Sequence, residues 1–99
     1  MHIIKEAPDK FYIGEAPDNI LAWIDYQMYG RVMSILHTEV SEALQGQGAG
    51  QQLVAYAVDY ARRNDLKIDP VCPYARSQFG KNSKYWDVLD LYAANSMGG

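Results

Sequence analysis

One strongly amphipathic stretch, about Gly48 to Asn64, divides the sequence into a strand-rich first part and a short mixed end. Its apolar side chains recur at helical spacing and form one stripe, which comprises Leu53, Val54, Ala57, Val58 and Ala61. Arg62 and Arg63 close the stretch, where cations suit the helix dipole. The pattern predicts one central helix with a buried face.

Three stretches before this helix carry the aromatic and branched residues typical of strands, and short turn signals separate them. We expect strands over Phe11 to Glu15, Leu21 to Gln27 and Arg31 to Val40. Strands joined by short turns form an antiparallel meander. Alternation in the last strand predicts two faces, one with Val32, Leu36, Thr38 and Val40 and the other with Met33, Ile35, His37 and Glu39.

The chain beyond the helix begins with a short predicted strand, Leu66 to Cys72. It follows a strand and a crossover helix, so it should run parallel to that strand through a right-handed connection. Pro70 has no N–H for a ladder, which predicts that the pairing breaks there. Two short helices are expected from Tyr74 to Ala94, and the tail from Asn95 to Gly99 is expected to fray. The predicted fold class is therefore α/β, with a mixed sheet of three antiparallel strands and one parallel strand.

Length and composition restrict the class of protein. A chain of 99 residues forms one domain, here 1–99 with a core at about 11–91, and 48% hydrophobic residues suffice for a folded core. The net charge of −3, with no basic stripe, argues against nucleic-acid binding. No apolar run approaches the roughly 20 residues of a membrane span. One Cys, two scattered His and no export signal predict a cytoplasmic protein without a metal site.

The glycine-rich segment Gln45 to Gly50 carries the most chemical information. It lies between a strand and the helix, where glycine lets backbone amides approach a ligand closely. Unpaired N–H groups in the first helical turn, together with the helix dipole, favour an anion, and a diphosphate suits such a site without any basic side chain. A dinucleotide-binding fold would instead need its glycines after the first strand of a βαβ unit, and a P-loop would need Gly-Lys-Ser/Thr. A plain glycine-rich turn that binds nothing is the remaining alternative.

Several motifs, taken in order, resemble the GNAT acetyltransferases, in particular their small single-domain subfamily. The segment Gln45-Gly46-Gln47-Gly48-Ala49-Gly50 resembles the Q/R-x-x-G-x-G/A signature, between His37-Thr38-Glu39-Val40 and a strand that ends in Pro70-Val71-Cys72-Pro73. The resemblance covers about Phe11 to Leu91. Ser41 departs from the usual proline and Gln45 from the commoner arginine, but neither change removes a backbone amide from the loop.

The resemblance implies a minimal GNAT fold with acetyl-CoA as cosubstrate and an amine acceptor, for which a protein or peptide is one candidate. It implies that the backbone at Val40 pairs with the pantetheine arm. The pyrophosphate would be held by the backbone amides of Gln45, Gly46, Gln47, Gly48, Ala49 and Gly50. The strands containing Val40 and Val71 would splay to leave a slot for the thioester, and Pro70 independently favours that splay.

Three side chains are candidate catalytic groups. Cys72 ends the last strand beside the slot, and it is either a nucleophile or a small buried hydrophobe. His37 and Glu39 share a predicted strand face about 6–7 Å apart, and either is a candidate general base. The alternatives for this pair are a structural histidine and a solvated carboxylate. Tyr74 and Tyr85 are weaker candidates for protonating the leaving thiolate.

Three functions follow from these observations. The first is an N-acetyltransferase that transfers an acetyl group from acetyl-CoA to an amine, by direct transfer. The second is a module that binds CoA or acyl-CoA with little or no turnover. The third is a structural adaptor whose glycine loop binds nothing.

Overall fold

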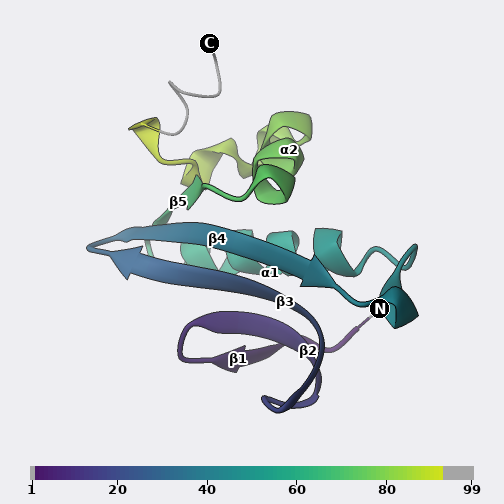
Figure 1. Cartoon of the computed structure of the whole chain (residues 1–99). Helices are drawn as coiled ribbons and strands as arrows, with labels where there is room; N and C mark the ends of the chain where they lie inside the picture. Colours follow the sequence, from purple (N-terminus) through teal and green to yellow (C-terminus); the bar gives the residue numbers. More distant parts are fainter. Residues whose placement is uncertain (1, 93–99) are drawn as a thin grey trace.

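The fold is a five-stranded mixed sheet with one long helix across one of its faces (Figure 1). The structure is a computed structural model, which describes residues 2–92. The strands are β1 (Lys5–Ala7), β2 (Lys10–Ala16), β3 (Asn19–Tyr29), β4 (Val32–Val40) and β5 (Lys67–Pro70), in the sheet order β1-β2-β3-β4-β5. The helical segments are η1 (Glu42–Leu44), α1 (Ala49–Arg63), α2 (Pro73–Lys81) and η2 (Ser83–Val88).

The connections follow the sequence pattern closely. The pairs β1–β2, β2–β3 and β3–β4 are antiparallel, and β5 returns after α1 to pair with β4 in parallel. The observed helix α1 agrees with the predicted one, with Gly48 and Asn64 as its two caps. Asn82 divides the two C-terminal helical segments, the second of which is a 3₁₀ helix. The α/β prediction is therefore confirmed, while the prediction for Asn95 to Gly99 lies outside the described residues.

Strand β1 corrects the predicted number of antiparallel strands, because the structure has four and not three. Its three residues, Lys5, Glu6 and Ala7, pair with Tyr12, Phe11 and Lys10. A strand this short, with two charged residues out of three, has no alternating apolar pattern to detect. Its position at the sheet edge, where charged side chains are common, explains that composition.

A β-bulge in β4 corrects the predicted faces of this strand. Asp25 of β3 pairs with His37, but the next residue, Tyr26, pairs with Ile35, so Leu36 is left out of the register. An extra residue in one strand reverses the alternation beyond it. Met33 and Ile35 therefore share the core face with Thr38 and Val40. His37 and Glu39 lie on the opposite face, beside Trp23 and Asp25.

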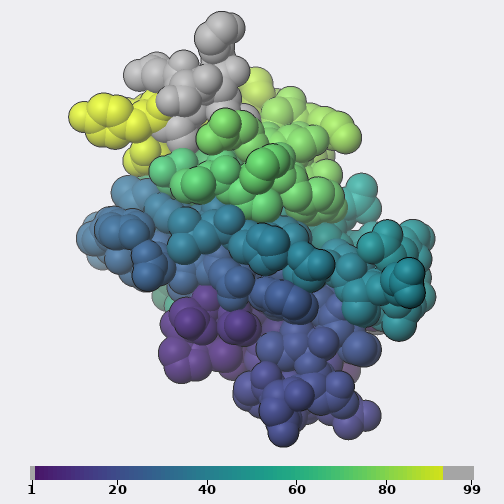
Figure 2. Space-filling model, viewed as in Figure 1, coloured from purple at the N-terminus to yellow at the C-terminus, as the bar shows by residue number. Residues whose placement is uncertain are grey.

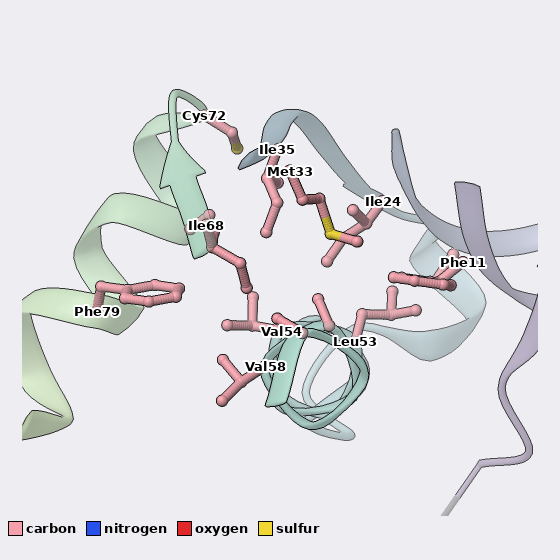
Figure 3. Packing of buried hydrophobic residues seen from close by; sticks show 14 of the residues in the cluster. Phe11, Ile24, Met33, Ile35, Leu53, Val54, Val58, Ile68, Cys72 and Phe79 are labelled. Atoms are coloured by element: carbon pink, nitrogen blue, oxygen red, sulfur yellow. The ribbon is translucent and has the colours of Figure 1, made fainter. Parts of the chain in front are cut away.

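The core lies between the sheet and α1, and α2 closes it beyond β5 (Figure 3). Leu53 and Val54 of α1 point toward the sheet, on which Ile24, Met33, Ile35 and Ile68 lie, and Val58 points to the side of the helix on which Phe79 lies. Phe79 reaches the same cluster from α2. All these side chains are almost completely buried, and such burial contributes about 1.5–3 kcal/mol for each large apolar side chain. The apolar stripe predicted for the helix is the stripe that faces this core.

Two glycines outside the loop give opposite predictions for the same substitution. Gly80 is exposed in α2 with no atom near the position of an added Cβ, so Gly80→Ala should raise the free energy of unfolding by about 0.5–1 kcal/mol. At Gly14, an added Cβ would lie 2.3 Å from the Asn19 carbonyl oxygen. Gly14→Ala should therefore lower the free energy of unfolding by about 1–3 kcal/mol. Urea denaturation of both variants measures the changes, and equal effects would contradict the backbone contact in the β2–β3 turn.

Candidate acetyl-CoA site

The segment between β4 and α1 folds back on itself through short backbone hydrogen bonds. The amides of Leu44, Gln45 and Gln47 donate to the carbonyls of Ser41, Glu42 and Leu44, at 3.0, 3.2 and 3.2 Å. Gly46 and Gly48 have left-handed backbone angles, with φ of 78° and 74°. An L residue with a Cβ adopts such angles only at a cost of about 1–2 kcal/mol, which explains why glycine stands at both positions.

The first turn of α1 leaves backbone donors without acceptors. Gln52 donates to Gly48 at 3.0 Å, which is the first bond of the helix. Across residues 2–92, no acceptor is found for the amides of Gly48, Ala49, Gly50 and Gln51. These N–H groups and the positive end of the 15-residue helix favour an anion at the same point.

A cleft of about 320 Å³ opens directly onto these amides. It is lined by Thr38, Val40, Leu44, Gln45, Gly46, Gly48, Ala49, Gly50, Gln51 and Tyr74. None of these side chains is charged, so no carboxylate in the lining opposes a phosphate group. Six of the seven residues predicted to bind the cofactor line this cleft, and Gln47 is the exception, since its side chain donates to the Ala43 carbonyl at 3.1 Å.

The cleft continues along an unpaired edge of β4. The ladder between β4 and β5 ends at the pair Ile35 and Pro70, whereas β4 runs on to Val40. The Ser41 amide donates to Leu21 of β3 at 2.8 Å, so by alternation the backbone groups of Val40 point to the opposite, open edge. There the side-chain amide of Gln45 donates to the Val40 carbonyl at 3.2 Å. This open edge has the hydrogen-bonding groups that an extended ligand needs.

Cys72 lies at the point where β4 and β5 separate. It is the N-cap of α2, is 5% exposed, and its amide donates to the Ile35 carbonyl at 2.9 Å. Its thiol donates to Oγ1 of Thr38 at 3.5 Å, and Thr38 lines the cleft. In Figure 3 the sulfur points toward β4. Both sequence interpretations of Cys72 stay open, because the thiol is buried and contacts Thr38, a residue that lines the cleft.

His37 and Glu39 form a hydrogen-bonded pair on the outer face of the sheet. His37 Nε2 and Glu39 Oε2 are 2.9 Å apart, and the two side chains are 55% and 50% exposed. Trp23 lies beside His37, with ring centroids 6.4 Å apart. The pair is therefore on the other side of β4 from the cleft. Figure 2 shows this face, on which none of the helices in the described part of the chain covers β3 and β4.

Tyr74 belongs to the site, and a glycine accounts for its position. An added Cβ at Gly50 would lie 2.8 Å from the Tyr74 hydroxyl and 2.9 Å from its Cζ, so the ring packs directly on the first turn of α1. Burial, followed by the proximity of Cys72 and Tyr85, raises the pKa of the Tyr74 phenol above its ordinary value of 10.0. The phenol therefore keeps its proton at neutral pH. Gly50 thus also makes room for a side chain of this protein, in addition to the backbone role predicted for it.

Three lining residues were not among the predicted site residues, namely Thr38, Leu44 and Gln51, while Tyr74 was predicted only as a weaker candidate acid. Thr38 faces the cleft only because of the bulge at Leu36, which the alternation could not reveal. Gln51 lies in the first turn of the predicted helix, so the sequence already placed its backbone amide at the site.

Within the described part of the chain, no three His, Cys, Asp or Glu side chains gather into a metal site. Over residues 2–92, no helix has the length and apolar character needed to cross a membrane.

Comparisons with known proteins agree with this architecture. The family model of the GCN5-related N-acetyltransferases matches residues 10–88. A GCN5-like protein from Staphylococcus aureus, solved by NMR, is 40% identical, with a TM-score of 0.75, over 89% of this chain and 87% of the other. The chain belongs to the GCN5-related N-acetyltransferase family, and this membership supports acyl transfer to an amine.

More distant structures share the fold alone. An acetyltransferase candidate from Agrobacterium tumefaciens has a TM-score of 0.56 and 19% identity, over 81% of this chain and 59% of the other. The ribosomal-protein-S18-alanine N-acetyltransferase of Escherichia coli has a TM-score of 0.52 and 15% identity, over 64% of this chain and 42% of the other.

Proposed function

We propose that this protein transfers an acetyl group from acetyl-CoA directly to an amine. The observation that carries the proposal is the set of unpaired amides at Gly48, Ala49, Gly50 and Gln51, which open onto an uncharged cleft. A diphosphate accepts hydrogen bonds from several backbone donors at once and is attracted by the helix dipole. The cleft then leads along the open edge of β4, whose backbone groups suit the amide-containing arm of CoA.

The acceptor amine approaches from the face of the sheet opposite the cleft. Thr38 lines the cleft, while its neighbours His37 and Glu39 point to the other side of β4. Since β5 ends at Pro70, no strand among residues 2–92 pairs with this part of β4 on its open edge. The amine can reach the acyl carbon through this gap, with the His37–Glu39 pair on its side to take the proton.

Bound acetyl-CoA supplies an activated acyl carbon in its thioester. The amine nitrogen forms a bond to that carbon, the carbon–sulfur bond breaks, and CoA leaves as a thiolate. His37, held at 2.9 Å by Glu39, accepts the proton that the amine loses. Tyr74 lines the cleft and carries a proton at neutral pH, so it is the group that protonates the thiolate. Tyr85 packs against Phe79, with ring centroids 5.7 Å apart, and does not line the cleft.

Cys72 has two proposed roles that one variant distinguishes. As a nucleophile it would accept the acetyl group before the amine does. As a packed thiol it would only support Thr38. Cys72→Ala should leave turnover within about threefold of wild type if transfer is direct, whereas a loss of about 100-fold or more would indicate the covalent route.

The proposed base gives a sharp activity prediction. Glu39→Gln and His37→Asn should each lower kcat by about 100-fold, because a positioned general base contributes roughly that factor or more. The side chains are exposed, so folding should be preserved. Acetyl-CoA binding, measured by calorimetry, should be unchanged, because neither side chain lines the cleft. If wild type, Glu39→Gln and His37→Asn had the same kcat, this would contradict the role of the His37–Glu39 pair as general base.

A coupled thiol-release assay with a panel of amines tests the function itself. The panel includes small amines, free amino acids and peptides with N-terminal or lysine amines. Acetyl-CoA binding with release of free thiol that depends on the amine supports the enzyme. Binding without turnover on any amine would replace it with the CoA-binding module. The nature of the acceptor, the cytoplasmic location and the single-domain organisation stay predictions.

A further inference from the structure

We infer that Tyr74 is a specificity-determining residue that restricts the acyl group to acetyl. This inference rests on the proposed function and deepens it, because it concerns the acyl end of the same cleft. Four observations support it: the direction of the cleft, the hydrogen bonds at its end, the burial of Cys72 and the packing of Tyr74 on Gly50.

The cleft has two ends with different chemistry. One end is formed by the glycine loop and the free amides of α1, where a diphosphate binds. Thr38 of β4 lines the cleft where β4 and β5 separate. Tyr74 follows two residues after Cys72, which contacts Thr38, and it lines the cleft from α2 with a ring that extends back to Gly50. A ligand whose diphosphate lies on the loop and whose arm follows β4 therefore presents its acyl group between Thr38 and Tyr74.

The acyl end of the cleft is closed by hydrogen bonds on the side that faces the core, and the outer face of the sheet stays open to the amine. Cys72 donates from its amide to Ile35 at 2.9 Å and from its thiol to Thr38 at 3.5 Å. The thiol therefore bridges the start of α2 and the bulged part of β4. Ile35 is fully buried and Cys72 is 5% exposed, so the space behind Thr38 is filled. A longer acyl chain cannot extend in that direction without displacing the core.

Tyr74 forms the remaining wall, and it has little room to retreat toward α1. Its hydroxyl, Cζ and Cε2 lie 2.8, 2.9 and 3.0 Å from the position of an absent Gly50 Cβ. The ring is therefore already packed on the backbone of the first helical turn. A methyl group fits beside a fixed ring, whereas each added methylene meets it and costs binding.

The test compares the binding of CoA, acetyl-CoA and butyryl-CoA by calorimetry. The proteins are wild type, Tyr74→Ala, Tyr74→Phe and Gly50→Ala, with folding checked by circular dichroism. Wild type should bind butyryl-CoA at least about 10-fold more weakly than acetyl-CoA. Tyr74→Ala should reduce this ratio to below about threefold. Tyr74→Phe should keep the wild-type ratio, because the ring remains and only the hydroxyl is lost.

Gly50→Ala gives an independent result without changing Tyr74 itself. The added methyl must push the ring away from α1, so the ratio of the Kd for butyryl-CoA to the Kd for acetyl-CoA should change. This result is obtained even if Tyr74→Ala does not fold. An equal affinity of wild type for both ligands, or an unchanged ratio in Tyr74→Ala and Gly50→Ala, would overturn the inference while leaving acetyl-CoA binding intact. Failure of CoA itself to bind wild type would overturn the proposed function along with it.

Discussion

Gly46→Asp should weaken acetyl-CoA binding by about 10- to 100-fold relative to Gly46→Asn. Gly46 has a φ of 78°, and Asn and Asp are the residues with a side chain that best tolerate this angle. Among the residues that the structure describes, none beyond the two chain neighbours has an atom within 4 Å of an added Cβ, so both side chains fit. The two variants therefore differ mainly by one negative charge beside the proposed diphosphate. Like charges at about 6 Å in a partly solvated site repel by roughly 1.5–3 kcal/mol.

Stability separates this effect from damage to the fold. A carboxylate near the N-terminus of α1 interacts favourably with the helix dipole. Gly46→Asp should therefore melt at the same temperature as Gly46→Asn or higher, although it binds acetyl-CoA less tightly. Calorimetric titrations at two salt concentrations measure the difference, which should shrink at high salt. The same Kd for the two variants would show that no phosphate lies near Gly46.

Phe11→Ala should lower the free energy of unfolding by about 3–5 kcal/mol. Phe11 is fully buried, and its ring contacts Tyr26, Tyr56 and Tyr60 with centroid distances of 4.9, 5.0 and 5.1 Å. Alanine leaves a cavity that three large rings from β3 and α1 cannot fill without moving. Since small domains are stable by about 5–15 kcal/mol, this loss would leave much of the protein close to unfolding.

Urea denaturation measures this loss, and Tyr29→Ala is the matched control. Tyr29 is also an aromatic residue on a strand, but it is 61% exposed. Its removal should change the free energy of unfolding by no more than about 0.5 kcal/mol. A change below about 1 kcal/mol for Phe11→Ala would contradict the packing of α1 on the strands β2 and β3.

Regular apolar spacing and the backbone chemistry of single residues explain which parts of the fold were predicted from the sequence. The stripe of Leu53, Val54 and Val58 predicted α1 and its buried face. Pro70 predicted where the parallel ladder ends, because a residue without an N–H cannot extend it. Both predictions depended only on residues within one segment, and contacts with the rest of the chain did not change the result.

Tertiary contacts explain the parts that were missed or wrong. Strand β1 is stabilised by pairing with β2, and its own sequence carries no strand signal. The bulge at Leu36 depends on the register with β3, so His37 and Glu39 were placed on the face of Met33 and Ile35. This assignment was wrong because one unpaired residue reverses every later side chain.

The candidate site also has features that the sequence predicted and features that depend on tertiary contacts. The loop residues Gly46 and Gly48 were predictable, because a glycine-rich segment before a helix has a direct physical meaning. The packing of Tyr74 on Gly50 joins residues from two different helices, and neither carries a sign of the other in the sequence. The contact between Cys72 and Thr38 likewise exists only because the bulge turns Thr38 toward the core face.

A titration with acetyl-CoA, followed by the amide resonances of the ¹⁵N-labelled protein, tests the central claim most directly. The claim is that the unpaired amides at the start of α1 bind the diphosphate. The largest shifts should fall on Gly46, Gly48, Ala49, Gly50 and Gln51, with further shifts at Val40 on the strand edge. No shifts at millimolar ligand, or shifts confined to another surface such as the cleft beside Ile4 and Tyr56, would contradict the claim.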